Sequence, residues 1–211
     1  LPLLSIPILL MLRTPQSASQ SASESSGRSL IQILMMPRYM LAVAAGVVSY
    51  GLMAFVMTAA PIAMVNTGHS VDSAALGIQW HLLAMFAPSF VTGRLMTRFG
   101  KERVTAAGML LIAVSAVVAL AGLELINFWG SLAIMGIGWN FSFIGATAMV
   151  TDCHTPGERA KAQGANDFMV FGTTAAVSFL AGSVLHNSGW AAINWLLFPP
   201  VALILVPLLW Q

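Results

Sequence analysis

The chain alternates long apolar runs with short polar connections. From residue 38 onward, six such runs cover 38–65, 71–96, 103–123, 126–150, 160–186 and 191–210. About 20 predominantly apolar residues cross the ~30 Å hydrocarbon core of a bilayer as an α-helix. Backbone polar groups in lipid must be satisfied within the segment, which favours helices over open strands. The pattern predicts an all-α membrane protein with six transmembrane helices.

Two further segments precede these runs. Residues 1–12 are apolar but would span only about 18 Å as a helix, so we expect the end of a preceding transmembrane helix. Residues 13–37 are polar and rich in Ser, a composition that cannot bury a core. We expect this segment to be a flexible linker, with a short amphipathic piece at 30–36. The predicted organisation is therefore 1–12, 13–37 and a six-helix bundle over 38–211.

The cations are confined to one side of the predicted membrane. All nine Lys and Arg residues lie in the linker region or in the connections after the second and fourth runs, whereas the opposite connections carry only Asp72 and Glu124. Lys and Arg in short loops stay predominantly in the cytoplasm. We therefore expect the linker and the C-terminus to be cytoplasmic, in a plasma membrane or bacterial inner membrane.

Composition excludes several classes of protein. The 211 residues are 58% hydrophobic and only 8% charged, whereas soluble domains are about a quarter charged. No basic and aromatic pattern suggests nucleic acid, and the single cysteine, Cys153, leaves no disulfide or cysteine cluster for a metal. Metalloprotease, nucleophile-elbow and phosphate-loop motifs are absent from the sequence. We expect no enzyme, no cofactor and no metal.

A compact basic connection lies between the second and third runs, where Gly100 is expected to adopt a positive φ in a tight turn. Its spacing resembles the loop motif Gly-x-x-x-Asp-Arg-x-Gly-Arg/Lys of the major facilitator superfamily. The matching positions are Gly93, Arg98, Gly100, Lys101 and Arg103, with Thr97 at the family's acidic position.

A second segment, 156–168, resembles the loop and helix start that follow the fourth and tenth spans of superfamily members. It carries the Glu158 and Arg159 pair and then Gly164. With the linker, which resembles the family's central cytoplasmic loop, the resemblance covers nearly the whole chain. It implies the C-terminal half of a secondary transporter for a small organic solute, in which two six-helix bundles alternate access. The alternative is a non-transporting membrane scaffold or assembly factor that retains this fold.

Polar and aromatic residues near the middle of the runs are candidates for a substrate cavity, because polar groups deep in a bilayer usually face a cavity or a partner helix. His81 has two alternative roles. It either contacts substrate or transfers a proton, or it is a neutral imidazole hydrogen-bonded between helices. Packing or helix-to-helix contact is the alternative for the other members. The candidates are Tyr50, Gln79, His81, Trp139 and Asn140.

A second group of candidates concerns gating. Asp167 would lie roughly 10 Å deep in the fifth run. There it either complements the helix dipole or serves in gating or proton coupling. His81 is the other candidate for gating or proton coupling. The cytoplasmic loops are expected to be held together by charge, with Arg94 or Arg98 near Asp152 or Glu158. The candidate gate charges are Arg94, Arg98, Lys101, Arg103, Asp152, Glu158 and Arg159.

Small residues in the spans are expected to let helices approach closely, among them Gly164, Gly172 and Gly182. No Lys or Arg lies mid-span, which suits an uncharged or amphipathic solute. One bundle would leave its cavity-facing polar groups in lipid. We therefore expect the bilayer, a small-molecule substrate, a proton and an N-terminal six-helix half, in the same protein or a second chain, as partners.

Overall fold

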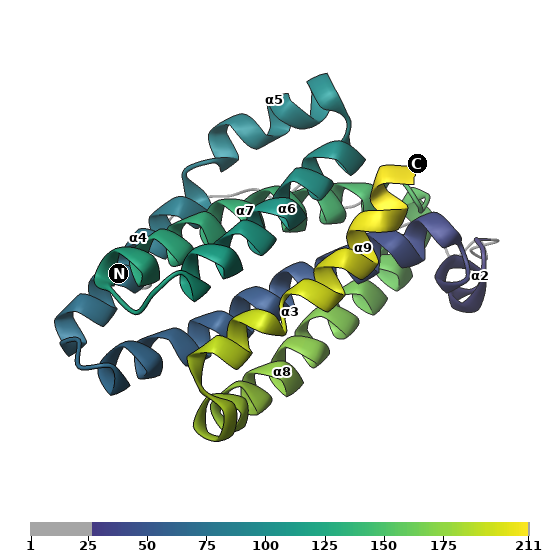
Figure 1. Cartoon of the computed structure of the whole chain (residues 1–211). Helices are drawn as coiled ribbons and strands as arrows, with labels where there is room; N and C mark the ends of the chain where they lie inside the picture. Colours follow the sequence, from purple (N-terminus) through teal and green to yellow (C-terminus); the bar gives the residue numbers. More distant parts are fainter. Residues whose placement is uncertain (1–26, 211) are drawn as a thin grey trace, which may run out of the picture.

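The computed structural model describes residues 27–210, and the regular structure of these residues is helical throughout (Figure 1). The expectations for residues 1–12 and 13–26 lie outside the described residues. The helices are α2 (Leu30–Leu34), α3 (Pro37–Asn66), α4 (Val71–Phe86), α5 (Ser89–Phe99), α6 (Lys101–Leu120), α7 (Leu125–Thr151), α8 (Arg159–Trp195) and α9 (Phe198–Trp210), with a 3-10 turn, η2, at Pro156–Glu158.

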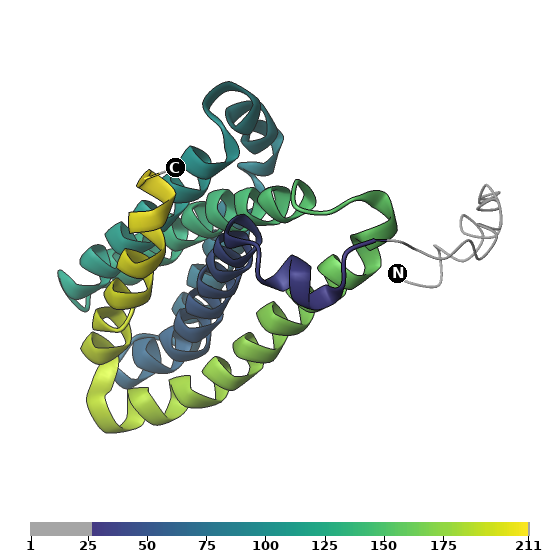
Figure 2. The same cartoon turned by 90° about the vertical axis from the view of Figure 1, so that its right-hand side faces the viewer.

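The long helices form one bundle in which α7 has a central place. It packs against α6, α4 and α3, while α8 lies along α3 and α9 lies against α6 and α3. The beginnings of α3, α6 and α8 meet the ends of α7 and α9 at the same end of the bundle, on the right in Figure 1 and toward the viewer in Figure 2. We call this end of the bundle the basic end, because the described Lys and Arg residues lie in α5, before α3 or in the helix ends that meet here.

The number of passes follows from helix length and chain direction. By length and composition, membrane-spanning stretches are Pro37–Asn66, Lys101–Leu120, Leu125–Thr151 and the 55-residue stretch Pro156–Trp210, with the bent pair α4 and α5 as a fifth. The chain reverses direction between α8 and α9 (Figure 1), so the 55-residue stretch supplies two passes. The six predicted runs thus correspond to α3, α4 with α5, α6, α7, α8 and α9.

The reversal between α8 and α9 differs from the predicted boundaries. Gly189 has φ 76° and ψ −179° inside α8, and the residues on both sides of it are helical. A positive φ is readily adopted by glycine alone. Within the predicted connection over 187–190 only Gly189 departs from helical geometry, so α8 continues to Trp195. The last helix, α9, begins at Phe198 instead of 191.

The second predicted run is not one helix. α4 ends at Phe86 and α5 begins at Ser89, and the two helices are bent by 41°. Pro88 lies at this break. Proline lacks a backbone N–H and its ring clashes with the preceding turn, so it kinks or ends a helix. The prediction of a continuous helix over 71–96 is wrong at this point.

Close helix contact occurs at other glycines than the sequence suggested. A Cβ on Gly108 of α6 would lie 2.6 Å from the Gly138 carbonyl oxygen of α7, so the two backbones touch. By contrast, a Cβ on Gly164, Gly172 or Gly182 would meet nothing within 4 Å. The expectation that these three residues bring helices together is not met among the described residues, because no other helix comes within contact distance of a Cβ at these positions.

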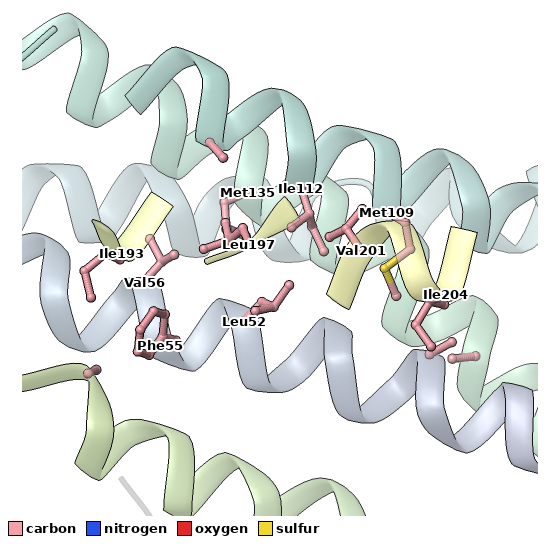
Figure 3. Packing of buried hydrophobic residues seen from close by; sticks show 14 of the residues in the cluster. Leu52, Phe55, Val56, Met109, Ile112, Met135, Ile193, Leu197, Val201 and Ile204 are labelled. Carbon is pink, nitrogen blue, oxygen red and sulfur yellow. The ribbon is translucent and has the colours of Figure 1, made fainter. Parts of the chain in front are cut away.

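Apolar side chains fill the space between the passes. Leu52 and Val56 of α3, Ile112 of α6, Met135 of α7 and Val201 of α9 point toward one another (Figure 3). Small residues are common in this core. Helix association in lipid depends on such van der Waals packing, because lipid tails are as apolar as the core itself.

Candidate functional site

Asn140 of α7 connects the two halves of the broken span. Its Nδ2 donates to the Met85 carbonyl at 2.8 Å and to Ser89 Oγ at 2.7 Å, and its Oδ1 accepts from Thr92 Oγ1. Because Pro88 interrupts the helix, the carbonyls before it need other donors. Asn140 is fully buried, and Thr92 is the buried residue of α5. Asn140, predicted as a cavity residue, therefore hydrogen-bonds residues on both sides of the break between α4 and α5.

His81 of α4 is also fully buried. Its Nδ1 lies 2.8 Å from the Leu132 carbonyl of α7, and since a carbonyl only accepts, Nδ1 carries the proton. Its Nε2 has no hydrogen-bond partner among the described residues. A Cβ on Gly136 would lie 2.6 Å from the His81 carbonyl oxygen, so α4 and α7 are in backbone contact here. This geometry corresponds to the alternative of an imidazole hydrogen-bonded between helices.

Four aromatic side chains come together from three helices. Tyr50 of α3 makes edge contacts with Trp139, Phe143 and Phe171, at ring-centroid distances of 5.6, 5.0 and 5.5 Å. Trp139 stacks on Phe143, one turn further along α7, at 5.0 Å. We call Tyr50, Trp139, Phe143 and Phe171 the aromatic cluster.

The aromatic cluster is closed on one side and open on the other. Met53 and Met85 pack against Trp139 on the inner side, and the Trp139 Nε1–H has no partner among the described residues. Phe171 on α8 is 53% exposed. Sequence reasoning found Tyr50 and Trp139 but missed Phe143 and Phe171. The signal for Phe143 was its i, i+4 spacing from Trp139, which puts both rings on one helix face.

The remaining cavity and gating candidates lie apart from these contacts. Gln79 of α4 and Asp167 of α8 are both exposed. Asp167 accepts one hydrogen bond, from its neighbour Asn166 at 3.1 Å. Among the residues described, no group of three or more His, Cys, Asp or Glu side chains is placed to hold a metal ion.

Ion pairs join three helices at the basic end. Lys101 at the start of α6 lies 2.6 Å from Asp152 after α7, and Arg38 of α3 lies 2.7 Å from Glu102 and 3.8 Å from Asp152. The predicted link between the two loops therefore forms through Lys101. Gly100 has the expected positive φ, 90°.

The expected partners of that link, Arg94 and Arg98, form no ion pair with any described residue. Both residues are on α5, which the break at Pro88 turns away from α4 by 41°. Arg98 instead lies over the ring of Phe99, 5.2 Å from its centroid. Arg103 and Arg159 are likewise exposed and form no ion pair within 27–210.

Glu158 pairs with a linker residue, which sequence reasoning missed. Arg28 Nε and Nη2 donate to the two Glu158 carboxylate oxygens at 2.9 and 2.7 Å, and the Arg28 backbone N–H donates at 2.8 Å. Arg28 Nη2 also donates to the Cys153 carbonyl at 2.9 Å. We call these bonds the linker pin.

The Glu158 carboxylate of the linker pin is also held in place by hydrogen bonds within its own loop. Glu158 is buried and also accepts from the Thr155 backbone N–H at 3.0 Å, in a capping box. The Arg28 guanidinium, and then the Thr155 N–H, hold the pKa of this carboxyl well below its usual value. The Thr-Pro-Gly-Glu capping pattern at 155–158 was the sequence signal for a fixed carboxylate.

The fold, the buried polar contacts between passes and the basic end define a multi-pass membrane protein. The family profile described as Major Facilitator Superfamily matches residues 41–211, and the chain belongs to this superfamily. The relatives that the chain matches are named as transporters.

Three relatives give the comparison more detail. The riboflavin transporter RfnT of Brucella anthropi is 67% identical over 208 residues, which are 98% of this chain and 52% of RfnT. Two uncharacterized transporters of Bacillus subtilis, YdeG and YddS, are each 33% identical, over 74% and 68% of this chain. The chain spans about half the length of RfnT and about a third of the other two.

Proposed function

We propose that this chain forms one six-helix bundle of a secondary transporter for riboflavin or a closely similar planar solute. The observation that carries the proposal is the 67% identity to a riboflavin transporter over 98% of the chain. The aromatic cluster supports it, because stacked and edge-on rings suit a flat aromatic ring system. Within the cluster, Tyr50, Trp139 and Phe171 are the residues we assign to substrate contact.

The transport mechanism we propose is alternating access with a second six-helix bundle. An unpartnered face of α8 supports this, since Phe168, Phe171 and Phe179 are all exposed there and its glycines have open space beside them. Exposed small residues let another helix approach closely. Asp167 belongs to this helix as well, and we assign it to gating or proton coupling, whereas His81 and Asn140 hold α4 and α5 on α7.

Uptake of radiolabelled riboflavin tests the proposal. The complete transporter that contains this bundle would be expressed in bacteria that lack riboflavin uptake. We expect uptake that excess unlabelled riboflavin suppresses. Phe171→Ala should lower uptake about tenfold at low substrate concentration, because an aromatic contact contributes up to about 1.5 kcal/mol beyond burial.

The matched control is Phe90→Ala, which removes an 88% exposed phenylalanine of α5 that lies outside both the aromatic cluster and the unpartnered face of α8. It should keep near-normal uptake at equal expression. Uptake that excess riboflavin leaves unchanged would overturn the substrate. Equal losses in the two variants would overturn the role of the aromatic cluster.

A further inference from the structure

A large open pocket lies at the basic end, away from the aromatic cluster. Its volume is about 810 Å³, far more than the roughly 30 Å³ that one water occupies. Four helix ends build it, those of α3, α5, α6 and α9. Its principal lining residues are Arg38, Phe99, Glu102, Arg103, Leu208 and Leu209.

The lining has one positive charge in excess. Arg38 is neutralised by Glu102 at 2.7 Å, whereas Arg103 forms no ion pair with any residue in 27–210. The guanidinium of Arg103 therefore has its donors available for an anion. Arginine binds phosphate oxygens through two parallel N–H donors, which gives a strong and directional contact.

The apolar part of the pocket points to a lipid as the source of that anion. Leu208 and Leu209 end the apolar helix α9, on which Leu203, Val206 and Leu209 are exposed. Phe99 of α5 also lines the pocket and is exposed. A soluble phosphate would gain nothing from these side chains. A phospholipid would place its phosphate on Arg103 and its acyl chains along α9.

We propose that this pocket binds the headgroup of an anionic phospholipid. Basic pockets between transmembrane helices on the cytoplasmic side suit such headgroups, because that leaflet carries anionic lipid. The assignment of the pocket to the cytoplasmic leaflet rests on the proposed cytoplasmic position of the basic end. The pocket itself shares no residue with the aromatic cluster, so the proposal stands apart from the identity of the transported solute. The bound lipid would join α9 to α5 and α6, and so stabilise the basic end.

Native mass spectrometry of the delipidated protein in mild detergent tests this. The protein would be titrated with phosphatidylglycerol or with phosphatidylcholine of the same acyl chains. We expect preferential binding of phosphatidylglycerol. Arg103→Gln should weaken that binding about tenfold, as expected for loss of one charge-assisted contact, whereas Arg103→Lys, which keeps the charge, should lose less.

Two controls make the outcome decisive. Arg94→Gln removes a nearby exposed cation that does not line the pocket and should leave phosphatidylglycerol binding unchanged. Glycerol phosphate, which has the anion without acyl chains, should not displace the lipid at equal concentration. Equal binding of the two lipids, equal effects of the Arg103→Gln and Arg94→Gln variants, or displacement by glycerol phosphate would each overturn the proposal.

Discussion

Two buried polar side chains connect α4 and α7 in opposite directions. His81 of α4 donates to a carbonyl of α7, and Asn140 of α7 donates to a carbonyl of α4. Each places a side-chain donor on a backbone oxygen that water cannot reach, which is what a polar group in a bilayer requires. The cost of burying such groups identified both residues from sequence. It could not reveal their partners, which lie 48 to 55 residues away along the chain.

Removing the Asn140 side chain should release α5. In Asn140→Ala, Met85 and Ser89 lose a shared donor and Thr92 loses an acceptor, each bond contributing about 0.5–1.5 kcal/mol. We expect amide hydrogen exchange across Ser89–Phe99 to rise about tenfold or more, with α6 little changed. Exchange measured by mass spectrometry on the purified protein checks this.

Thr92→Val is the graded control, because it removes one of the three Asn140 bonds, together with the Thr92 contact to the Pro88 carbonyl at 2.8 Å, and keeps the shape of the side chain. It should raise exchange in α5 by less than Asn140→Ala does. Unchanged exchange in both variants would show that apolar packing, and not the Asn140 amide, holds α5 in place.

At the scale of single elements, α5 shows what apolar continuity conceals. Residues 71–96 are apolar enough to be one span, and the prediction was based on this apolar character. It did not take into account Pro88, although proline commonly ends or kinks a helix. Arg94 and Arg98 lie on α5, after this break, and form no ion pair with the acids that they were expected to meet. The partners of Lys101 and Arg38 depend on how helix ends converge, which no local pattern encodes.

The linker pin predicts a specific pH dependence for α2. Because the folded-state pKa of Glu158 is lowered, the pin is fully formed above the ordinary carboxyl value of 4.5 and weakens only as pH falls below it toward the folded value. Protection factors of the α2 amides should therefore hold between pH 7 and 4.5. The measurement is hydrogen exchange corrected for intrinsic rates.

The control variant is Glu158→Gln, which keeps the size of the side chain and removes its charge. It should show low α2 protection at every pH, so that it and the natural protein converge only in strong acid. Equal protection of α2 in the two proteins at pH 7 would mean that the linker is held by its apolar contacts alone.

At the scale of the whole molecule, the all-helical fold and the family followed from sequence for physical reasons. Lipid demands long apolar helices, and the one-sided distribution of cations orders the connections between them. The central place of α7 did not follow, because it depends on where Gly108, Gly136 and Gly138 admit a neighbouring backbone. Nor did the aromatic cluster, since it needs Phe171 of α8 beside Tyr50 of α3.

Cysteine labelling in intact cells should establish the orientation. In a Cys153→Ser background, Asn187→Cys, near the turn between α8 and α9, should react with a membrane-impermeant maleimide from outside. Thr97→Cys, at the basic end, should react only after permeabilisation. Both positions are exposed, so access alone decides the result. The reverse pattern would place the basic end outside the cell.

The linker pin also has a consequence for the order of events during synthesis. Arg28 leaves the ribosome 130 residues before Glu158, an interval of roughly 6 to 26 s at 5–20 residues per second. During that time α3 to α7 are made while Arg28 has no carboxylate to bind. The linker can therefore be fastened only after the α7–α8 connection has been translated, so its attachment marks a late stage in the biogenesis of the bundle.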